Sequence, residues 1–136
     1  MKKVLFLCTG NSCRSQMAEG FLHHIASDKF EVFSAGVKPT QVNPFAIKIM
    51  AEVGIDISSY RSKSVTEFLG QRFDYVITLC DNAKQTCPMF SDQYKKIHWD
   101  IEDPADAKGS EEERLYFFRK IRNEIKNRCL YFMNKY

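Results

Sequence analysis

The 136-residue chain lacks long hydrophobic runs, a large charge of one sign, repeats, low-complexity segments and linkers. Its first apolar run, residues 4–7, is too short for the core of a signal peptide or for a membrane span, so we expect a cytoplasmic protein that does not enter a membrane. The net charge of +3 is spread along the chain and gives no indication of nucleic-acid binding, although a slightly basic surface attracts small oxyanions. This length predicts one domain, residues 1–136.

Histidine is also scarce, and its placement argues against a metal site. His23 and His24 are neighbours on a predicted helix and point apart, while His98 stands alone. Structural zinc sites pair cysteines with about two to four residues between them and need two further ligands. Cys80 and Cys87 have six residues between them, and the histidines do not supply the missing ligands. We expect no metal ion and no cofactor.

Cysteine, in contrast, is present in an odd number without any export signal. In the cytoplasm structural disulfides are rare, and redox or catalytic thiols are the more common use of cysteine. We therefore expect thiol chemistry from some of the five, which are Cys8, Cys13, Cys80, Cys87 and Cys129.

Apolar stretches alternate with helical patterns and predict an α/β fold. The predicted strands are residues 4–7, 30–34, 75–79 and 96–99, and the predicted helices cover residues 17–27, 44–53, 62–69 and 110–133. At this size, the alternation predicts a four-stranded parallel sheet with helices on both faces. Asn43 followed by Pro44 is typical of a helix start, and Ser110 with Glu113 has the spacing of a capping box. Cys129 falls on the apolar face of the last helix, so we assign it a core position and no chemical role.

Three side chains that could take part in a reaction follow predicted strands. Cys8 follows the first, Cys80 the third, and Asp103 lies in the loop after the fourth. Because ligands bind at the carboxyl ends of parallel strands, we expect all three at one edge of the sheet.

Residues 2–21 contain the strongest local signal, a strand that leads through a polar loop into a helix. Helix N-terminal N–H groups and the guanidinium of Arg14 favour a tetrahedral oxyanion, and the same positive surroundings favour the thiolate of Cys8. A cysteine at a strand end is commonly just a small buried apolar residue, but the full Cys-x5-Arg-Ser pattern predicts a nucleophile within an anion site.

The sequence CTGNSCRSQMAEG resembles the phosphate-binding loop of the low-molecular-weight protein tyrosine phosphatases and their relatives, the thiol-dependent arsenate reductases, and the resemblance runs the length of the chain. It implies a flavodoxin-like fold with Cys8 as nucleophile, Ser15 as hydrogen-bond partner of its thiolate, and Asp103, before Pro104, as general acid. Asn11 would shape the loop through a left-handed backbone. The oxyanion would be bound by Thr9, Gly10, Asn11, Ser12, Cys13 and Arg14. Cys13 is expected to pack in the loop.

Cys80 and Cys87 distinguish the two branches of this family. The thioredoxin-coupled reductases keep a matching cysteine pair, whereas the phosphatases need only the loop cysteine; two buried bystander thiols are the alternative. Ala105 and Asp106 follow Pro104, where many phosphatases carry aromatic residues. Both features favour arsenate reduction over hydrolysis of a phosphate monoester, and an oxyanion sensor without chemistry is the weakest of the three interpretations.

The resemblance implies a relay in which Cys8 attacks arsenate, Cys80 attacks Cys8, and Cys87 attacks Cys80, with thioredoxin or a similar thiol as final reductant. We expect a monomer. Some of these reductases bind potassium through the segment that here contains Arg61 and Lys63. A lysine repels a cation, so we expect no potassium and hypothesise a Lys63–Glu19 ion pair in its place.

Overall fold

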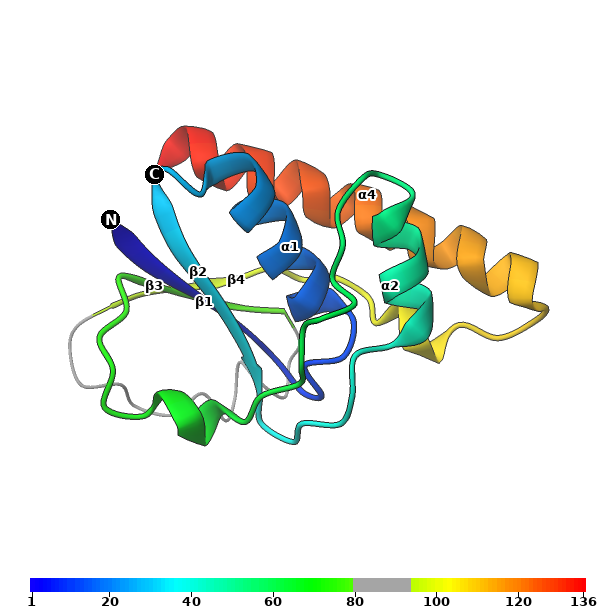
Figure 1. Ribbon diagram of the computed structural model, residues 1–136, viewed down its shortest axis with the longest axis horizontal. Coiled ribbons are helices and arrows are strands. Elements are labelled where there is room, and N and C mark those ends of the chain that lie inside the picture. The colour runs from blue at the N-terminus through cyan, green and yellow to red at the C-terminus, as the bar shows by residue number, and fades with distance from the viewer. Residues whose placement is uncertain (80–93) are drawn as a thin grey trace.

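A four-stranded parallel sheet forms the centre of the molecule, as the sequence predicts. The computed structural model describes residues 1–79 and 94–136. The strands are β1 (Lys2–Cys8), β2 (Phe30–Gly36), β3 (Tyr75–Thr78) and β4 (Lys95–His98). They are hydrogen-bonded in the order β2-β1-β3-β4, and every pair is parallel (Figure 1). From β1 the chain moves first to one side and later to the other, so the carboxyl ends of β1 and β3 flank the crevice in which doubly wound sheets bind ligands.

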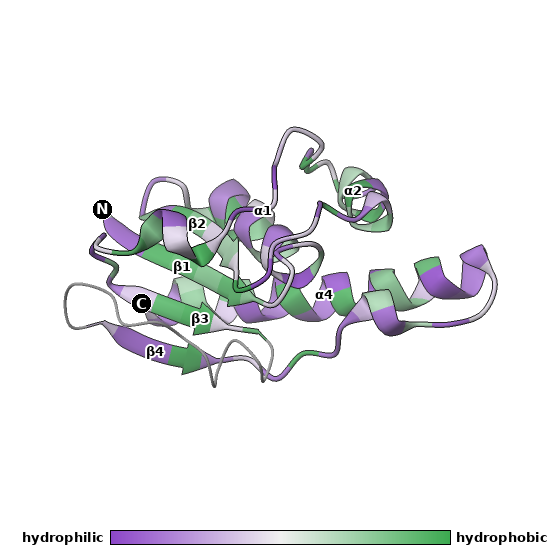
Figure 2. Ribbon diagram, turned by 90° about the horizontal axis from the view of Figure 1, so that it is seen from below, coloured by the Kyte–Doolittle hydropathy of each residue, from purple (hydrophilic) through white to green (hydrophobic). Residues whose placement is uncertain are grey.

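One face of the sheet is covered by α1 (Arg14–Ala26) and α4 (Glu111–Lys135), which lie side by side (Figure 1). α2 (Pro44–Ala51) packs against α4 beyond the sheet. The central strands β1 and β3 are largely buried because they are apolar on both faces, and Figure 2 shows them as mostly hydrophobic. The edge strand β4 begins hydrophilic and is exposed to half-buried. Among the described residues, no helix is both long and apolar enough to cross a membrane.

The opposite face carries a second, smaller core. A short 3-10 helix, η1 (Val65–Phe68), packs there in place of the short helix predicted for residues 62–69 (Figure 1). The buried residues of this second core are Leu5, Leu7, Ala35, Val65, Phe68, Phe73 and Val76. Sheet and helices therefore match the predicted fold, with helical segments on both faces.

Two helix starts predicted from the sequence, those of α2 and α4, are confirmed. The Asn43 side chain accepts a hydrogen bond from the N–H of Phe45, which satisfies one of the free donors at the start of α2. Ser110 and Glu113 form both hydrogen bonds of a capping box at the start of α4. Cys129 is fully buried on the inner face of α4, as its spacing indicates.

Candidate active site

The loop between β1 and α1 is held open by the segment that follows β2. Backbone N–H groups of this segment, from Val37, Lys38, Thr40 and Asn43, donate in turn to the carbonyls of Cys8, Thr9, Gly10 and Ser12. Since the C=O and N–H of a trans peptide point in opposite directions, each bound carbonyl turns the next N–H away from the segment. The result is a loop with donors on its free side, which suits an oxyanion.

Gly36, at the end of β2, lets this loop pack closely. A Cβ atom there would lie 2.7 Å from the Thr9 carbonyl oxygen and 2.8 Å from the Asn11 nitrogen. Any side chain would therefore push the loop backbone away. This requirement could not be predicted from the local sequence, because the contact joins residues that are distant along the chain.

Cys8 is almost completely buried at the floor of the loop. Its Sγ lies 2.8 Å from Ser15 Oγ and accepts a hydrogen bond from the Asn11 N–H at 3.2 Å. Burial raises the pKa of the Cys8 thiol, while the bonds from Ser15 and Asn11 and the charge of Arg14 lower it. Burial is the largest effect, so the expectation that positive surroundings alone favour the thiolate is too simple: the loop donors offset part of a desolvation cost.

Arg14 is fixed by the carboxyl ends of two strands. Its Nη1 donates to the carbonyl of Leu79, just after β3, at 2.9 Å and to that of Ile101, after β4, at 3.0 Å. Nη2 lies 3.5 Å from Oδ2 of Asp103. The guanidinium is thus oriented before any anion binds, and the catalytic acid expected from the sequence lies beside it.

Asp103 sits at the start of η2 (Pro104–Asp106), where its Oδ1 accepts a hydrogen bond from the Ala105 N–H. A cavity of about 270 Å³ brings Asp103 together with the loop, and it is lined by Cys8, Thr9, Gly10, Ser12, Cys13, Arg14, Thr40, Asp103 and Ala105. Most of the predicted site residues thus lie around one space. A larger cavity nearby, between η2 and α4, is lined by several carboxylates and would repel an oxyanion.

Asn11 and Ser15 do not line the cavity but support it from behind. Asn11 has a φ of +50°, the left-handed backbone expected of it. Its side-chain Nδ2 donates to Ser15 Oγ at 2.8 Å and to Ser34 Oγ at 3.0 Å. Both residues therefore act on the Cys8 sulfur. The side chain of Asn11 does not line the cavity that an anion would fill.

Of the remaining cysteines, Cys13 and Cys129 are both buried. Burial raises the pKa of Cys13 to about 12, which fits its expected packing role. Burial also raises the pKa of Cys129, which supports its core position. Cys80 and Cys87 lie outside the described residues. Leu79, the last described residue before them, carries the carbonyl that binds Arg14.

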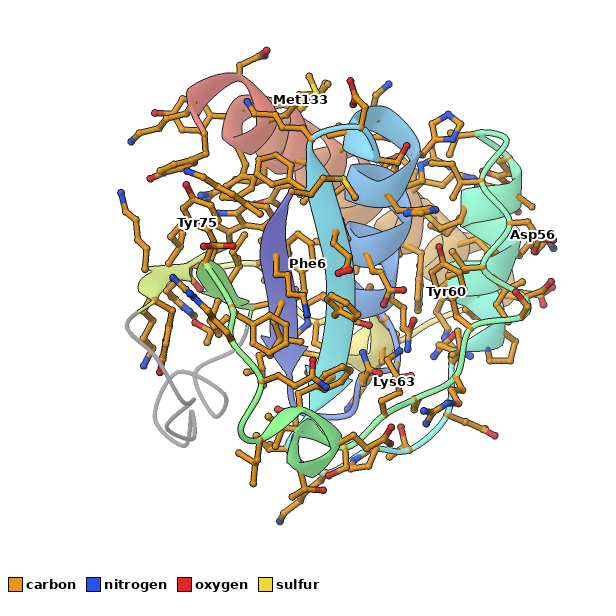
Figure 3. The ribbon with its side chains drawn as sticks, turned by 60° about the vertical axis from the view of Figure 1, so that its left-hand side comes forward. Phe6, Asp56, Tyr60, Lys63, Tyr75 and Met133 are labelled. Carbon is orange, nitrogen blue, oxygen red and sulfur yellow. The ribbon has the colours of Figure 1, made fainter. Side chains whose placement is uncertain are left out.

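The hypothesised ion pair between Lys63 and Glu19 is present. Lys63 Nζ lies 3.7 Å from Glu19 Oε1 and donates to the Arg61 carbonyl at 3.0 Å. Figure 3 shows Lys63 on the segment that runs past the carboxyl end of β2. An ammonium group occupies this position, so the residues here do not fit a bound potassium ion. Within residues 1–79 and 94–136, no three His, Cys, Asp or Glu side chains gather as a metal site.

Comparison with known proteins agrees with this geometry. The pattern that defines the low molecular weight phosphotyrosine protein phosphatase family matches residues 3–136. The chain belongs to this family. An arsenate reductase from Bacillus subtilis is 48% identical over 127 residues, which cover 93% of this chain and 91% of that protein.

Two solved structures of the family are similar along nearly the whole chain. An arsenate reductase in the phosphate binding state has a TM-score of 0.85 and 39% identity, covering 99% of this chain and 98% of the other. A thioredoxin-dependent arsenate reductase from Corynebacterium glutamicum has a TM-score of 0.78 and 29% identity, covering 99% of this chain and 61% of that longer one.

Proposed function

We propose that the protein reduces arsenate to arsenite, with Cys8 as nucleophile and a thioredoxin-type protein as the source of electrons. The observation that carries this proposal is the cavity in which Cys8, Arg14 and Asp103 surround a space for one small tetrahedral oxyanion. The similarity to arsenate reductases, one of them in a phosphate binding state, supports the same assignment.

The first step joins sulfur to arsenic. Arg14 and the loop N–H groups hold a dihydrogen arsenate ion, and the Cys8 thiolate attacks the arsenic atom. An As–O bond breaks, Asp103 gives a proton to the departing hydroxyl, and water leaves. The hydrogen bonds from Asn11 and Ser15 stabilise the thiolate that this step consumes.

The next two steps carry the oxidation away from the cavity. The Cys80 thiolate attacks the Cys8 sulfur, so a disulfide forms while the S–As bond breaks and leaves its electron pair on arsenic, which departs as arsenite. Cys87 then attacks Cys80 and frees Cys8 as a thiolate. These roles are assigned from the sequence and the family, because both residues lie outside the described part of the chain.

A thioredoxin-type reductant would then reduce the Cys80–Cys87 disulfide, as the name of the Corynebacterium glutamicum relative indicates for that protein. Such a cycle needs a compartment in which thiols stay reduced, such as the cytoplasm. We propose that the protein acts as a monomer.

Phosphatase activity is the second candidate, because the family as a whole is named for it. A phosphocysteine on Cys8, hydrolysed by water, would need no other cysteine. However, the described residues that line the cavity, Thr40 and Ala105 among them, include no aromatic side chain that would hold an aryl group. A small inorganic oxyanion therefore fits better than phosphotyrosine.

The test is arsenate-dependent oxidation of NADPH in the presence of thioredoxin and thioredoxin reductase. Wild type and the control Cys129→Ala should turn over, since Cys129 lies in the core, whereas Cys8→Ser and Cys87→Ser should not. Turnover by Cys87→Ser at the wild-type rate would exclude the relay. Brisk hydrolysis of p-nitrophenyl phosphate without any arsenate turnover would establish the phosphatase instead.

A further inference from the structure

Asn11 holds an unusual backbone conformation directly against the nucleophile. It is the single residue other than glycine with a positive φ in residues 1–79 and 94–136. Its N–H donates to Cys8 Sγ, so a change in the Asn11 backbone would move that donor away from the sulfur. Left-handed backbone is unfavourable for a residue with a side chain, so neighbouring groups must hold it in place.

The side chain of Gln16 contacts Asn11 at two points. Its Nε2 lies 3.0 Å from the Asn11 carbonyl oxygen and 2.9 Å from Asn11 Oδ1. The same nitrogen lies 3.0 Å from the Arg61 carbonyl oxygen. One amide group on α1 thus ties together the backbone and the side chain of Asn11 and the segment that carries Lys63.

This arrangement is not needed to satisfy buried polar groups. The Asn11 carbonyl also accepts from Ser62 Oγ, Asn11 Oδ1 from the Lys63 N–H, and the Arg61 carbonyl from Lys63 Nζ. Gln16 itself is fully buried, and its Oε1 has no hydrogen-bond partner. An apolar side chain of similar length would avoid that unfavourable burial and leave every acceptor with a donor.

We infer that Gln16 is a positioning residue for the reaction, which holds Asn11 in the left-handed conformation that directs its N–H at the Cys8 sulfur. It touches neither the cavity nor the reacting atoms. This inference builds on the proposed function, because it concerns the same nucleophile.

The experiment compares Gln16→Met with wild type in the full chain. Cys8 alkylation by iodoacetamide is followed by mass spectrometry of the Cys8 peptide, at pH values from neutral to strongly alkaline. Loss of one well-aligned donor should slow alkylation about three- to tenfold at pH 7. The rates should converge at high pH, where the thiol is ionised in both proteins. Protection by inorganic phosphate should require similar phosphate concentrations.

Leu22→Met is the matched control, since Leu22 is a fully buried residue of the same helix that lies away from the loop. Gln16→Leu serves as a second variant if Gln16→Met is poorly folded. Identical pH profiles for folded Gln16→Met and wild type would overturn the inference. An equal shift in Leu22→Met, or unfolding of both Gln16 variants, would overturn it too. A shifted profile in a protein that does not reduce arsenate would refute the proposed function and leave the role of Gln16 intact.

Discussion

At the scale of single residues, the reactivity of Cys8 depends on a balance between burial and hydrogen bonding. Burial raises the pKa of the thiol, and the side chain of Ser15, 2.8 Å from the sulfur, gives the largest of the opposing effects. Cys8 can serve as the proposed nucleophile only while these donors stay in place.

Replacing Ser15 with alanine should expose this balance. Without the hydroxyl the pKa of Cys8 rises further, so the thiolate that reacts is formed only at higher pH. We expect alkylation of Cys8 at pH 7 to slow about tenfold, with recovery as the pH rises. The pH profile of iodoacetamide labelling measures this directly. An unchanged profile would show that Ser15 does not act on the sulfur.

Gly36→Ala tests the close packing beneath the loop. The added methyl group would meet backbone atoms of Thr9 and Asn11 that cannot swing aside. We expect a loss of about 1–3 kcal/mol in the free energy of unfolding and weaker protection of Cys8 by phosphate. Gly54→Ala is the comparison, because no atom lies within 4 Å of a Cβ there, although its own positive φ disfavours a side chain. Urea denaturation and phosphate protection give both quantities.

Sequence reasoning proposed Cys8, Arg14 and Asp103 from the motif and the strand ends, and the three residues line one cavity. It could not find Gly36 or Gln16, since their importance comes from contacts with residues far away in the chain. It also assigned Asn11 to the oxyanion, whereas the Asn11 side chain faces Ser15 and Ser34 behind the loop.

At the scale of elements, polar links join the helices to their neighbours. Glu52, which ends α2, accepts hydrogen bonds from Arg119 and Arg122 of α4, and Arg122 also donates to the Ile49 carbonyl. These bonds, first of all that from Arg119, lower the pKa of Glu52 to about 2. The helix α2 beside the active-site loop is thereby tied to the longest helix.

Glu52→Gln should weaken this link in a pH-dependent way. A carboxyl whose pKa is lower in the folded state stabilises the protein above its unfolded pKa of 4.5, and that contribution is lost as the pH falls toward 2. We expect a loss of about 1 kcal/mol at pH 7, reduced by solvent screening, and no difference from wild type near pH 2. Thermal unfolding of both proteins across this pH range measures the difference in stability. A difference that does not change with pH would show that the Glu52 charge contributes nothing.

The ion pair between Lys63 and Glu19 leads to a prediction about salts. Since the Lys63 ammonium already lies 3.7 Å from the Glu19 carboxylate, exchanging NaCl for KCl at equal ionic strength should leave arsenate turnover unchanged. Steady-state rates in the two salts measure this. A specific increase with potassium would mean that the cation displaces Lys63.

Element boundaries show what patterns can and cannot predict. Within the described residues, apolar stripes and caps located the strands and the α-helices, but β2 extends two residues beyond its predicted end, through Ala35 to Gly36. Those residues are typical of a loop. Their pairing with Leu7 and Cys8 of β1 keeps them in the strand, and this pairing is a property of the sheet and not of the local sequence.

At the scale of the whole molecule, the parallel sheet brings distant residues to one edge. Cys8 ends β1, the carbonyl of Leu79 follows β3, and Asp103 lies in the loop after β4. Arg14 contacts the segments that follow β3 and β4. The fold could be predicted because strand order and alternation restrict a chain of this size to few arrangements. The relay could be predicted only from cysteine spacing and resemblance.

A single turnover without any reductant tests the proposed Cys8–Cys80–Cys87 relay. Fully reduced protein is mixed with excess arsenate, and arsenite, free thiols and disulfide-linked peptides are then measured. We expect one arsenite per chain, the loss of two thiols, and a Cys80–Cys87 disulfide in the peptide map. Arsenate left unreduced, with all five thiols still free, would exclude the relay.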